Sequence, residues 1–252
     1  MKKFLLSLCA IAPLSVMASP ALTQDQVGQM ATSYFKSHPE QMVNILKSMQ
    51  QHLRQAALNK AKQVIIDNKA LILGKDSFLP ITGNPKGSKT LLFVFDFQCV
   101  YCHKEAPLIA KLVKDNTDLK VVMMPLHVFG PASLYANQVA LYANSIGKFK
   151  SFYEAMEQAG LIEGKLTKEA VNKIMAKAGI KQTDFEQALK KGRISSQIKQ
   201  IDLLAQKLRI QGTPFMVIMP SNKKDMSFND ITLLPGYLAY DPLNSVVENN
   251  GN

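Results

Sequence analysis

The chain has 252 residues, of which 47% are hydrophobic and 19% are charged, and its formal net charge is +11. This composition is typical of a globular protein and excludes a disordered or collagen-like chain. With only three cysteines, the sequence also excludes a small domain held together by several disulfides. Beyond the N-terminus no apolar run reaches the roughly 18 residues of a transmembrane helix, which excludes a multi-spanning membrane protein.

Residues 1–18 have the pattern of a cleaved signal peptide. Lys2 and Lys3 precede a short apolar stretch that ends in Val-Met-Ala. A basic start, an apolar segment and small residues at the −3 and −1 positions mark a secretory cleavage site. We therefore predict cleavage after Ala18 and export into an oxidising compartment. The alternative, an uncleaved membrane anchor, would require a longer stretch and a charged flank.

Residues 19–74 are predicted to form a helical segment that precedes the main domain. Thr23 and Gln26 resemble a capping box, and Pro39 is suited to the first turn of a second, long helix. That helix carries an apolar stripe at heptad-like spacing, which comprises Met42, Leu46, Met49, Leu53 and Ala56. We expect the stripe to pair with a second copy, so that residues 19–74 hold a homodimer together. The alternatives are a trimer or packing back onto the same chain.

Residues 75–252 are predicted to form the main domain. Residues 77–81 read as a short edge strand, and the apolar runs at 90–95 and 119–125 read as buried strands on either side of a helix. Such a strand–helix–strand unit makes its two strands parallel. The pattern from about 131 to 209 is almost wholly helical. The segments 214–219 and 231–234 then form two further strands, followed by a short C-terminal helix. The fold class is therefore α/β with a helical insertion.

The most informative motif is the cysteine pair at the junction of a buried strand and a helix. If the signal is cleaved, Cys9 is lost, and the exported chain keeps only Cys99 and Cys102. Two cysteines so close in sequence cannot join distant loops, so chemistry explains them better than stability does. Cys99 at the helix start should be exposed and should form a thiolate readily, which makes it the attacking residue. Cys102, one turn later and facing inward, should resolve mixed disulfides.

Several motifs resemble those of one family. The segment Asp96–Lys104 is similar to the active site of disulfide isomerases, and Cys102 followed by Ala-Pro at 106–107 matches the pattern of the active-site helix. Gly212-Thr213-Pro214 before a strand is similar to a cis-proline loop. The chain thus resembles the thioredoxin superfamily, and specifically the bacterial periplasmic thiol–disulfide interchange proteins of the DsbA/DsbC/DsbG group.

This resemblance implies a thioredoxin-like fold with a helical insertion, and an enzyme that forms or reshuffles disulfides in exported proteins. It implies a redox-active disulfide between Cys99 and Cys102, and a substrate-binding loop at Thr213 and Pro214. The expected partners are unfolded or misbridged exported proteins and a membrane redox partner. No cofactor and no metal are expected, and the scattered basic residues do not suggest binding to nucleic acid.

Two features depart from the family pattern. Val100 and Tyr101 stand where strongly oxidising sites have Pro-His, so Cys99 should be less acidic than in a strong oxidant. Phe93 occupies the position of the buried acid of thioredoxin. Proton transfer to Cys102 must therefore use another base or water, and Asp96 either serves as that base or caps the turn.

Other functions remain as alternatives. Cys99, Cys102 and His103 also form a C-x-x-C-H sequence, the attachment signal for c-type haem. The same three residues, with His127, could supply ligands for copper or zinc. A scaffold that only oligomerises is a third alternative. Phe129 and Phe215 are expected to lie in the core rather than to contact substrate.

Overall fold

The computed structural model describes residues 22–249, so the predicted signal peptide lies outside the described residues. The chain divides into two compact units between Leu53 and Arg54. The predicted boundary at residue 74 lies later than this division. Ile65 and Ile72 precede that boundary but are buried in the core of the second unit, which explains the difference. Within the described residues, no helix is both long and apolar enough to span a membrane.

The first unit consists of α1 (Gln24–Ser37) and the beginning of α2 (Pro39–Asp67). Thr23 forms the predicted capping box, because its side chain accepts from Gln26 N and the Gln26 side chain accepts from Thr23 N. The α2 helix is continuous, as expected from the absence of internal Gly and Pro. The large apolar side chains of this unit are about half exposed, namely Leu22, Val27, Met30, Tyr34, Met42, Val43, Ile45, Leu46, Met49 and Leu53.

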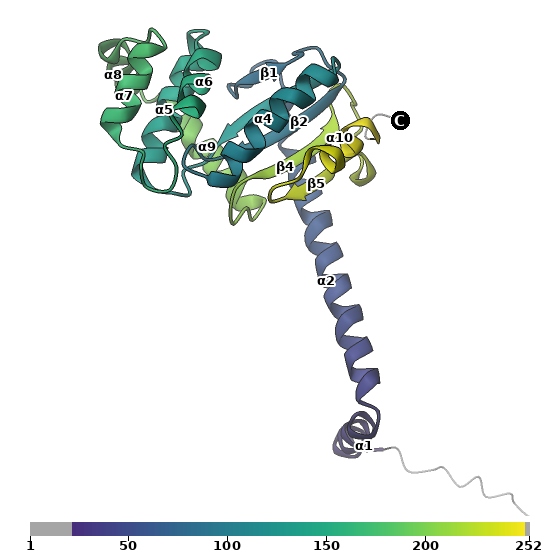
Figure 1. Ribbon diagram of the computed structural model, residues 1–252. Coiled ribbons are helices and arrows are strands. Elements are labelled where there is room, and N and C mark those ends of the chain that lie inside the picture. The colour runs from purple at the N-terminus through teal and green to yellow at the C-terminus, as the bar shows by residue number, and fades with distance from the viewer. Residues whose placement is uncertain (1–21, 250–252) are drawn as a thin grey trace, which may run out of the picture. The chain divides into compact units, whose positions relative to one another are not determined.

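The second unit contains the end of α2, the short helix α3 (Lys69–Leu73) and a five-stranded sheet of order β1-β3-β2-β4-β5 (Figure 1). As predicted, β2 pairs parallel with β3, whereas β4 runs antiparallel to β2. The edge strand β1 begins at Ile81, so the prediction that it starts at residue 77 was wrong. The strands are β1 (Ile81–Gly83), β2 (Lys89–Phe95), β3 (Leu119–Pro125), β4 (Phe215–Pro220) and β5 (Thr232–Pro235).

Helices flank this sheet. The helix α4 (Val100–Asp115) crosses one face of it, and the helical insertion gathers beyond one side (Figure 1). Between β4 and β5 lies the 3₁₀ turn η1 (Phe228–Asp230), and the helix α10 (Tyr240–Asn249) follows β5. The insertion has the predicted position and consists of α5 (Pro131–Ser145), α6 (Phe149–Ala159), α7 (Lys168–Lys177), α8 (Gln182–Lys190) and α9 (Arg193–Lys207).

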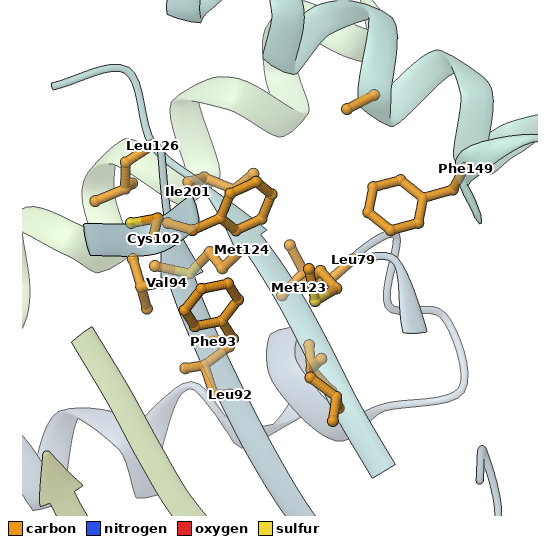
Figure 2. Packing of buried hydrophobic residues seen from close by; sticks show 14 of the residues in the cluster. Leu79, Leu92, Phe93, Val94, Cys102, Met123, Met124, Leu126, Phe149 and Ile201 are labelled. Atoms are coloured by element: carbon orange, nitrogen blue, oxygen red, sulfur yellow. The ribbon is translucent and has the colours of Figure 1, made fainter. Parts of the chain in front are cut away.

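The core lies on both faces of the sheet, because the central strands β2 and β3 are apolar along almost their whole length. Phe93 is aligned with Met123 on one side and with Met216 on the other. Each such fully buried side chain stabilises the fold by about 1.5–3 kcal/mol. Figure 2 shows Cys102 among the labelled members of this cluster, so one of the two cysteines is part of the core itself.

Candidate active site

The cysteine pair lies where β2 ends and α4 begins. Cys99 is the N-cap of α4, and its Sγ accepts a hydrogen bond from the backbone N–H of Cys102 at 3.3 Å. Both residues are free thiols, with exposed fractions of 3% for Cys99 and 2% for Cys102. The expectation that Cys99 is exposed was therefore wrong. The reason is the neighbouring loop, because the carbonyl oxygen of Thr213 lies 3.1 Å from the Cys99 sulfur.

The environment of Cys99 favours its thiolate. A hydrogen bond from the Cys102 side chain lowers the pKa of Cys99 most, and burial opposes this effect. Thr213 and the backbone N–H groups of residues 101 and 102 lower it further, so that the pKa falls from 9.0 to about 6. Unpaired N–H groups at a helix start stabilise a negative charge in this way. At neutral pH Cys99 is therefore mainly a thiolate, which is the reactive form.

Cys102 has the opposite character. Burial raises the pKa of its thiol far above the ordinary value, and the hydrogen bond with Cys99 raises it further. The buried neutral thiol can donate its proton to the Cys99 sulfur and can attack that sulfur once it carries a substrate. The two cysteines therefore differ in acidity and in burial, although they lie on the same helical turn.

The sheet brings the Thr213-Pro214 loop to the cysteines. Val94 near the end of β2 is aligned with Phe215 at the start of β4, so the residues that follow β2 meet those that precede β4. The Thr213–Pro214 peptide bond is cis. The Cys99 thiol donates to the Thr213 carbonyl, while the buried Thr213 hydroxyl has no hydrogen-bond partner among the described residues. That hydroxyl is therefore available to the thiolate.

Asp96 is buried before the cysteines and is surrounded by hydrogen-bond donors. One carboxylate oxygen accepts from Gln98 N at 2.8 Å and from Ser133 Oγ at 2.6 Å. The other accepts from Phe129 N at 3.1 Å. These donors come from the active-site turn and from the loop and helix that open the insertion. A carboxylate bound in this way stabilises the turn, and none of the three donors belongs to a cysteine.

Gln98 links the same turn to a second part of the insertion. Its side-chain amide donates to Ser133 Oγ at 2.9 Å, and its side-chain oxygen accepts from Gly164 N at 3.0 Å. Its backbone oxygen accepts from Glu163 N at 3.0 Å. The residue is 1% exposed, so these bonds are formed in a desolvated site. The active-site turn is thus fixed at its base by two separate segments of the insertion.

His103 is held by partners on both ring nitrogens. Nε2 lies 2.9 Å from the Phe97 carbonyl oxygen, and Nδ1 lies 2.9 Å from a carboxylate oxygen of Glu157 on α6. Burial lowers the pKa of His103, but the hydrogen bond and the charge of Glu157 outweigh burial and raise it. Neither nitrogen is free for a haem iron, and the second cysteine of the motif is buried in the core. This geometry argues against the haem alternative.

The residues proposed as metal ligands do not form one cluster. In the part of the chain that the structure describes, no three His, Cys, Asp or Glu side chains are grouped as a metal site would require. The His127 ring instead has Asp202 on α9 as its neighbour, with 3.6 Å between Nδ1 and a carboxylate oxygen. The structure therefore does not bring together the four residues named for copper or zinc.

Comparison with known proteins agrees with this geometry. Residues 90–239, more than half of the chain, match the model of the DSBA-like thioredoxin domain. The chain belongs to the DsbA-like thioredoxin family. This assignment accounts for the cysteine pair at the end of β2, the helical insertion and the Thr213-Pro214 loop, and it confirms the predicted fold and family.

Individual relatives support the same assignment. The chain is 26% identical over 159 residues to the thiol:disulfide interchange protein DsbA of Yersinia pestis, covering 60% of this chain and 72% of that protein. It is 26% identical to the thiol-disulfide exchange protein alpha-DsbA2 of Wolbachia pipientis, with a TM-score of 0.62 and coverage of 77% and 97%. BcfH of Salmonella enterica Typhimurium shares the fold, with a TM-score of 0.76, 24% identity and coverage of 90% and 96%. Thiol–disulfide exchange is thus the chemistry of this family.

Exposed apolar side chains surround the DsbA-like site. Tyr101 between the cysteines and Tyr237 after β5 have ring centroids 6.3 Å apart, and both are about half exposed. Val128 and Phe129 are exposed on the loop that bonds to Asp96. The expectation that Phe129 lies in the core was wrong, because its backbone rather than its ring is anchored. These two pairs of side chains form what we call the site rim.

Sequence reasoning missed Glu105, which is 0% exposed. The buried residues of α4 include Cys102, Glu105, Ile109 and Leu112, a spacing that places them on one face of the helix. One Glu105 oxygen accepts from Leu238 N at 3.1 Å, and the other has no hydrogen-bond partner among the described residues. The sequence did contain a signal for this burial. Glu105 lies three residues after Cys102, and this helical spacing places both residues on the buried face of α4.

Proposed function

We propose that the protein is a periplasmic thiol–disulfide oxidoreductase with isomerase activity toward exported proteins. The observation that carries the proposal is the pairing of an acidic Cys99 with a buried, neutral Cys102 beside the Thr213 carbonyl. The family performs thiol–disulfide exchange, and the predicted signal peptide supports export. The finer assignment to isomerisation depends on the surroundings of the site and on the exposed apolar residues of the first unit.

The proposed reaction begins at Cys99. Its thiolate attacks a sulfur of a wrong substrate disulfide, so that a mixed disulfide forms and the other substrate sulfur leaves as a thiolate. That thiolate, or another substrate thiol, can then attack within the same chain and release Cys99 in its original form. If no productive attack follows, Cys102 attacks the Cys99 sulfur and frees the substrate in reduced form. A membrane redox partner would then restore the starting redox state of the pair.

The surroundings of the site support a protein substrate. The site rim offers exposed aromatic and aliphatic side chains, and unfolded chains expose the same kinds of side chain. The backbone at Thr213 and Pro214 leads into β4 and is suited to an extended substrate segment that adds as a strand. We assign Thr213 and Pro214 to substrate positioning on this basis.

The exposed apolar residues of the first unit support self-association. From Leu22 to Leu53 ten large apolar side chains are about half exposed, which is costly for a monomer in water. We propose that residues 19–74 join two copies in a homodimer. Two active sites in one particle can hold a misfolded chain while Cys99 tests successive disulfides, which favours isomerisation over simple oxidation.

The experiment that tests the proposal compares two cysteine variants. Cys99→Ser should abolish reactivation of scrambled ribonuclease, whereas Cys102→Ser should accumulate mixed disulfides with it, as detected by non-reducing gels and mass spectrometry. The double variant serves as the control that forms no adduct. With limiting iodoacetamide the reduced wild type should be labelled first at Cys99. Preferential labelling of Cys102 would reverse the assigned roles, and inactivity of the wild type would refute isomerisation.

A further inference from the structure

The resolving step needs a proton acceptor for the Cys102 thiol. Burial keeps the Cys102 thiol neutral, so it must lose its proton as it attacks the Cys99 sulfur. Phe93 stands on β2 where thioredoxin has its buried acid, and it cannot accept a proton. Asp96 directs its carboxylate to Gln98, Phe129 and Ser133.

The Glu157 carboxylate is paired with the His103 ring, which leaves Glu105 as the buried carboxyl group on the same helix as Cys102. It lies three residues after Cys102 on the buried face of α4, and residues so spaced have Cβ atoms about 5–6 Å apart. Among the described residues the hydrogen bond of Glu105 is the one from Leu238 N, so a proton from the Cys102 thiol reaches Glu105 through one water. Its Oε2 accepts from Leu238 N, whereas its buried Oε1 has no partner among the described residues and is free to take a proton.

The same contact ties Glu105 to the substrate-binding side of the domain. Leu238 follows Gly236, whose N–H donates to the Pro214 carbonyl at 2.9 Å, and Tyr237 between them belongs to the site rim. The carboxyl group therefore lies where α4 meets the segment that borders the Thr213-Pro214 loop.

No salt bridge to Glu105 is formed within residues 22–249, so no cation fixes it in the ionised form. The titratable groups nearest to Glu105 and Leu238 along the chain are Cys102, His103 and Lys104 on α4, Tyr237 beside Leu238, and Tyr240 and Asp241 at the start of α10. The His103 ring is held by Glu157. Burial raises the pKa of Glu105 to about 7, and the hydrogen bond from Leu238 N partly opposes the rise. A group that titrates near neutrality can both take up and return a proton under working conditions.

We propose that Glu105 is the proton acceptor for Cys102 when the mixed disulfide is resolved. This inference rests on the proposed function. In the step, the Cys102 sulfur forms a bond to the Cys99 sulfur while its S–H proton passes to the Glu105 carboxylate. The bond between Cys99 and the substrate sulfur breaks, and the substrate leaves as a thiolate with the electron pair. The cysteine pair is oxidised and the substrate is reduced, so no outside oxidant is needed. In the reverse direction Glu105 returns the proton to the departing Cys102 thiolate.

Glu105→Gln is the informative variant, because its amide oxygen can still accept from Leu238 N but cannot take a proton. Reduced protein is mixed with oxidised glutathione, quenched in acid at set times and analysed by mass spectrometry. The formation of the Cys99–glutathione adduct should be unchanged, and its decay at neutral pH should slow on the order of 100-fold. Decay in the wild type should fall as the pH drops through about 7, and the variant should lack this inflection. Glu154→Gln on α6, an exposed carboxylate, is the matched control.

The outcomes separate the inference from the proposed function. Decay in Glu105→Gln within about threefold of wild type, with slow decay only in Glu105→Ala, would show that the residue merely holds Leu238 and would overturn the inference. If the wild type formed no adduct at all, the proposed function would fail and this inference with it. Should the Gln variant not fold, infrared spectroscopy of the wild type must show a buried carboxyl band that titrates near neutral pH. Absence of that band would equally overturn the assignment.

Discussion

At the scale of single residues, the two cysteines differ in acidity although they lie on the same helical turn. Cys99 caps the helix, and hydrogen bonds to its sulfur lower its pKa, whereas burial raises the pKa of Cys102. In the proposed function, this difference makes Cys99 the residue that attacks a substrate disulfide and Cys102 the residue that resolves the mixed disulfide. It also makes the reactivity of the protein dependent on pH in a way that can be measured.

We expect the alkylation rate of reduced Cys99 by iodoacetamide to rise with pH and to level off above an inflection near pH 6. Because folding lowers the pKa of Cys99 from 9.0 to about 6, its thiolate should also contribute stability. That contribution is full above about pH 9, shrinks below it and is lost as the pH falls through 6. The free energy of unfolding of reduced wild type minus that of Cys99→Ser should follow this course. An alkylation inflection at the ordinary thiol value would contradict the assigned environment.

At this scale the sequence predicted that Cys99 lies at the start of a helix, but the burial of Glu105 was not predicted from it. A helix start after a buried strand is visible in the order of the residues, so the position of Cys99 on the helix could be derived. Burial depends on which loop covers a residue, so the sequence could not predict that the loop with Thr213 covers Cys99. Glu105 was overlooked because a glutamate on a helix is ordinarily exposed, and only the packed fold shows it buried.

At the scale of secondary-structure elements, the active-site turn depends on the insertion. Ser133 on α5 donates to Asp96 and accepts from Gln98, so a single hydroxyl joins two buried polar side chains. Buried groups of this kind cost free energy when a partner is removed.

We therefore predict that Ser133→Ala lowers the free energy of unfolding by about 1–3 kcal/mol, because it leaves the Asp96 carboxylate short of a donor in a desolvated site. Chemical denaturation measures this change. Ser145→Ala near the end of the same helix, an exposed position, is the control and should change stability by less than about 0.5 kcal/mol. Equal effects of the two substitutions would show that the network does not stabilise the turn.

Secondary structure was predicted correctly from the sequence where an apolar pattern extends over many residues. The prediction failed for the short edge strand β1. The central strands follow from continuous apolar runs, and α2 follows from a long stretch without Gly or Pro. The start of β1 does not, because Phe78 and Leu79 are apolar but lie before the strand, and only pairing with β3 defines Ile81–Gly83 as a strand. Likewise, the order of residues around Phe129 could not show that its backbone is anchored and its ring exposed.

At the scale of the whole molecule, the chain combines a catalytic unit with a helical unit whose apolar residues are exposed. The predicted boundary at residue 74 differs from the division after Leu53, and Ile65 and Ile72 belong to the core of the second unit. A truncation at residue 74 would remove these core residues and would confuse loss of assembly with loss of folding. Point substitutions in the full chain avoid that problem.

We expect Leu46→Glu to dissociate the proposed dimer into monomers, because it places a charge in the apolar stripe of α2. Light scattering measures the mass. Gln51→Glu, on the opposite side of the same helix by its spacing, is the matched control and should stay dimeric. The monomer should keep its reductase activity on glutathione but lose isomerase activity on scrambled ribonuclease. A monomeric wild type would contradict the proposed assembly.

The two anchors of Gln98, at Ser133 and at Gly164, have a consequence for how this domain could be redesigned or shortened. An insertion in a sheet protein is usually regarded as a module that can be exchanged or deleted while the parent fold remains. Here the deletion would strip the donors from a buried carboxylate and a buried amide immediately before the reactive cysteine. A minimal version of this enzyme therefore cannot be made by excision alone, and would first need an apolar replacement for Asp96 and Gln98.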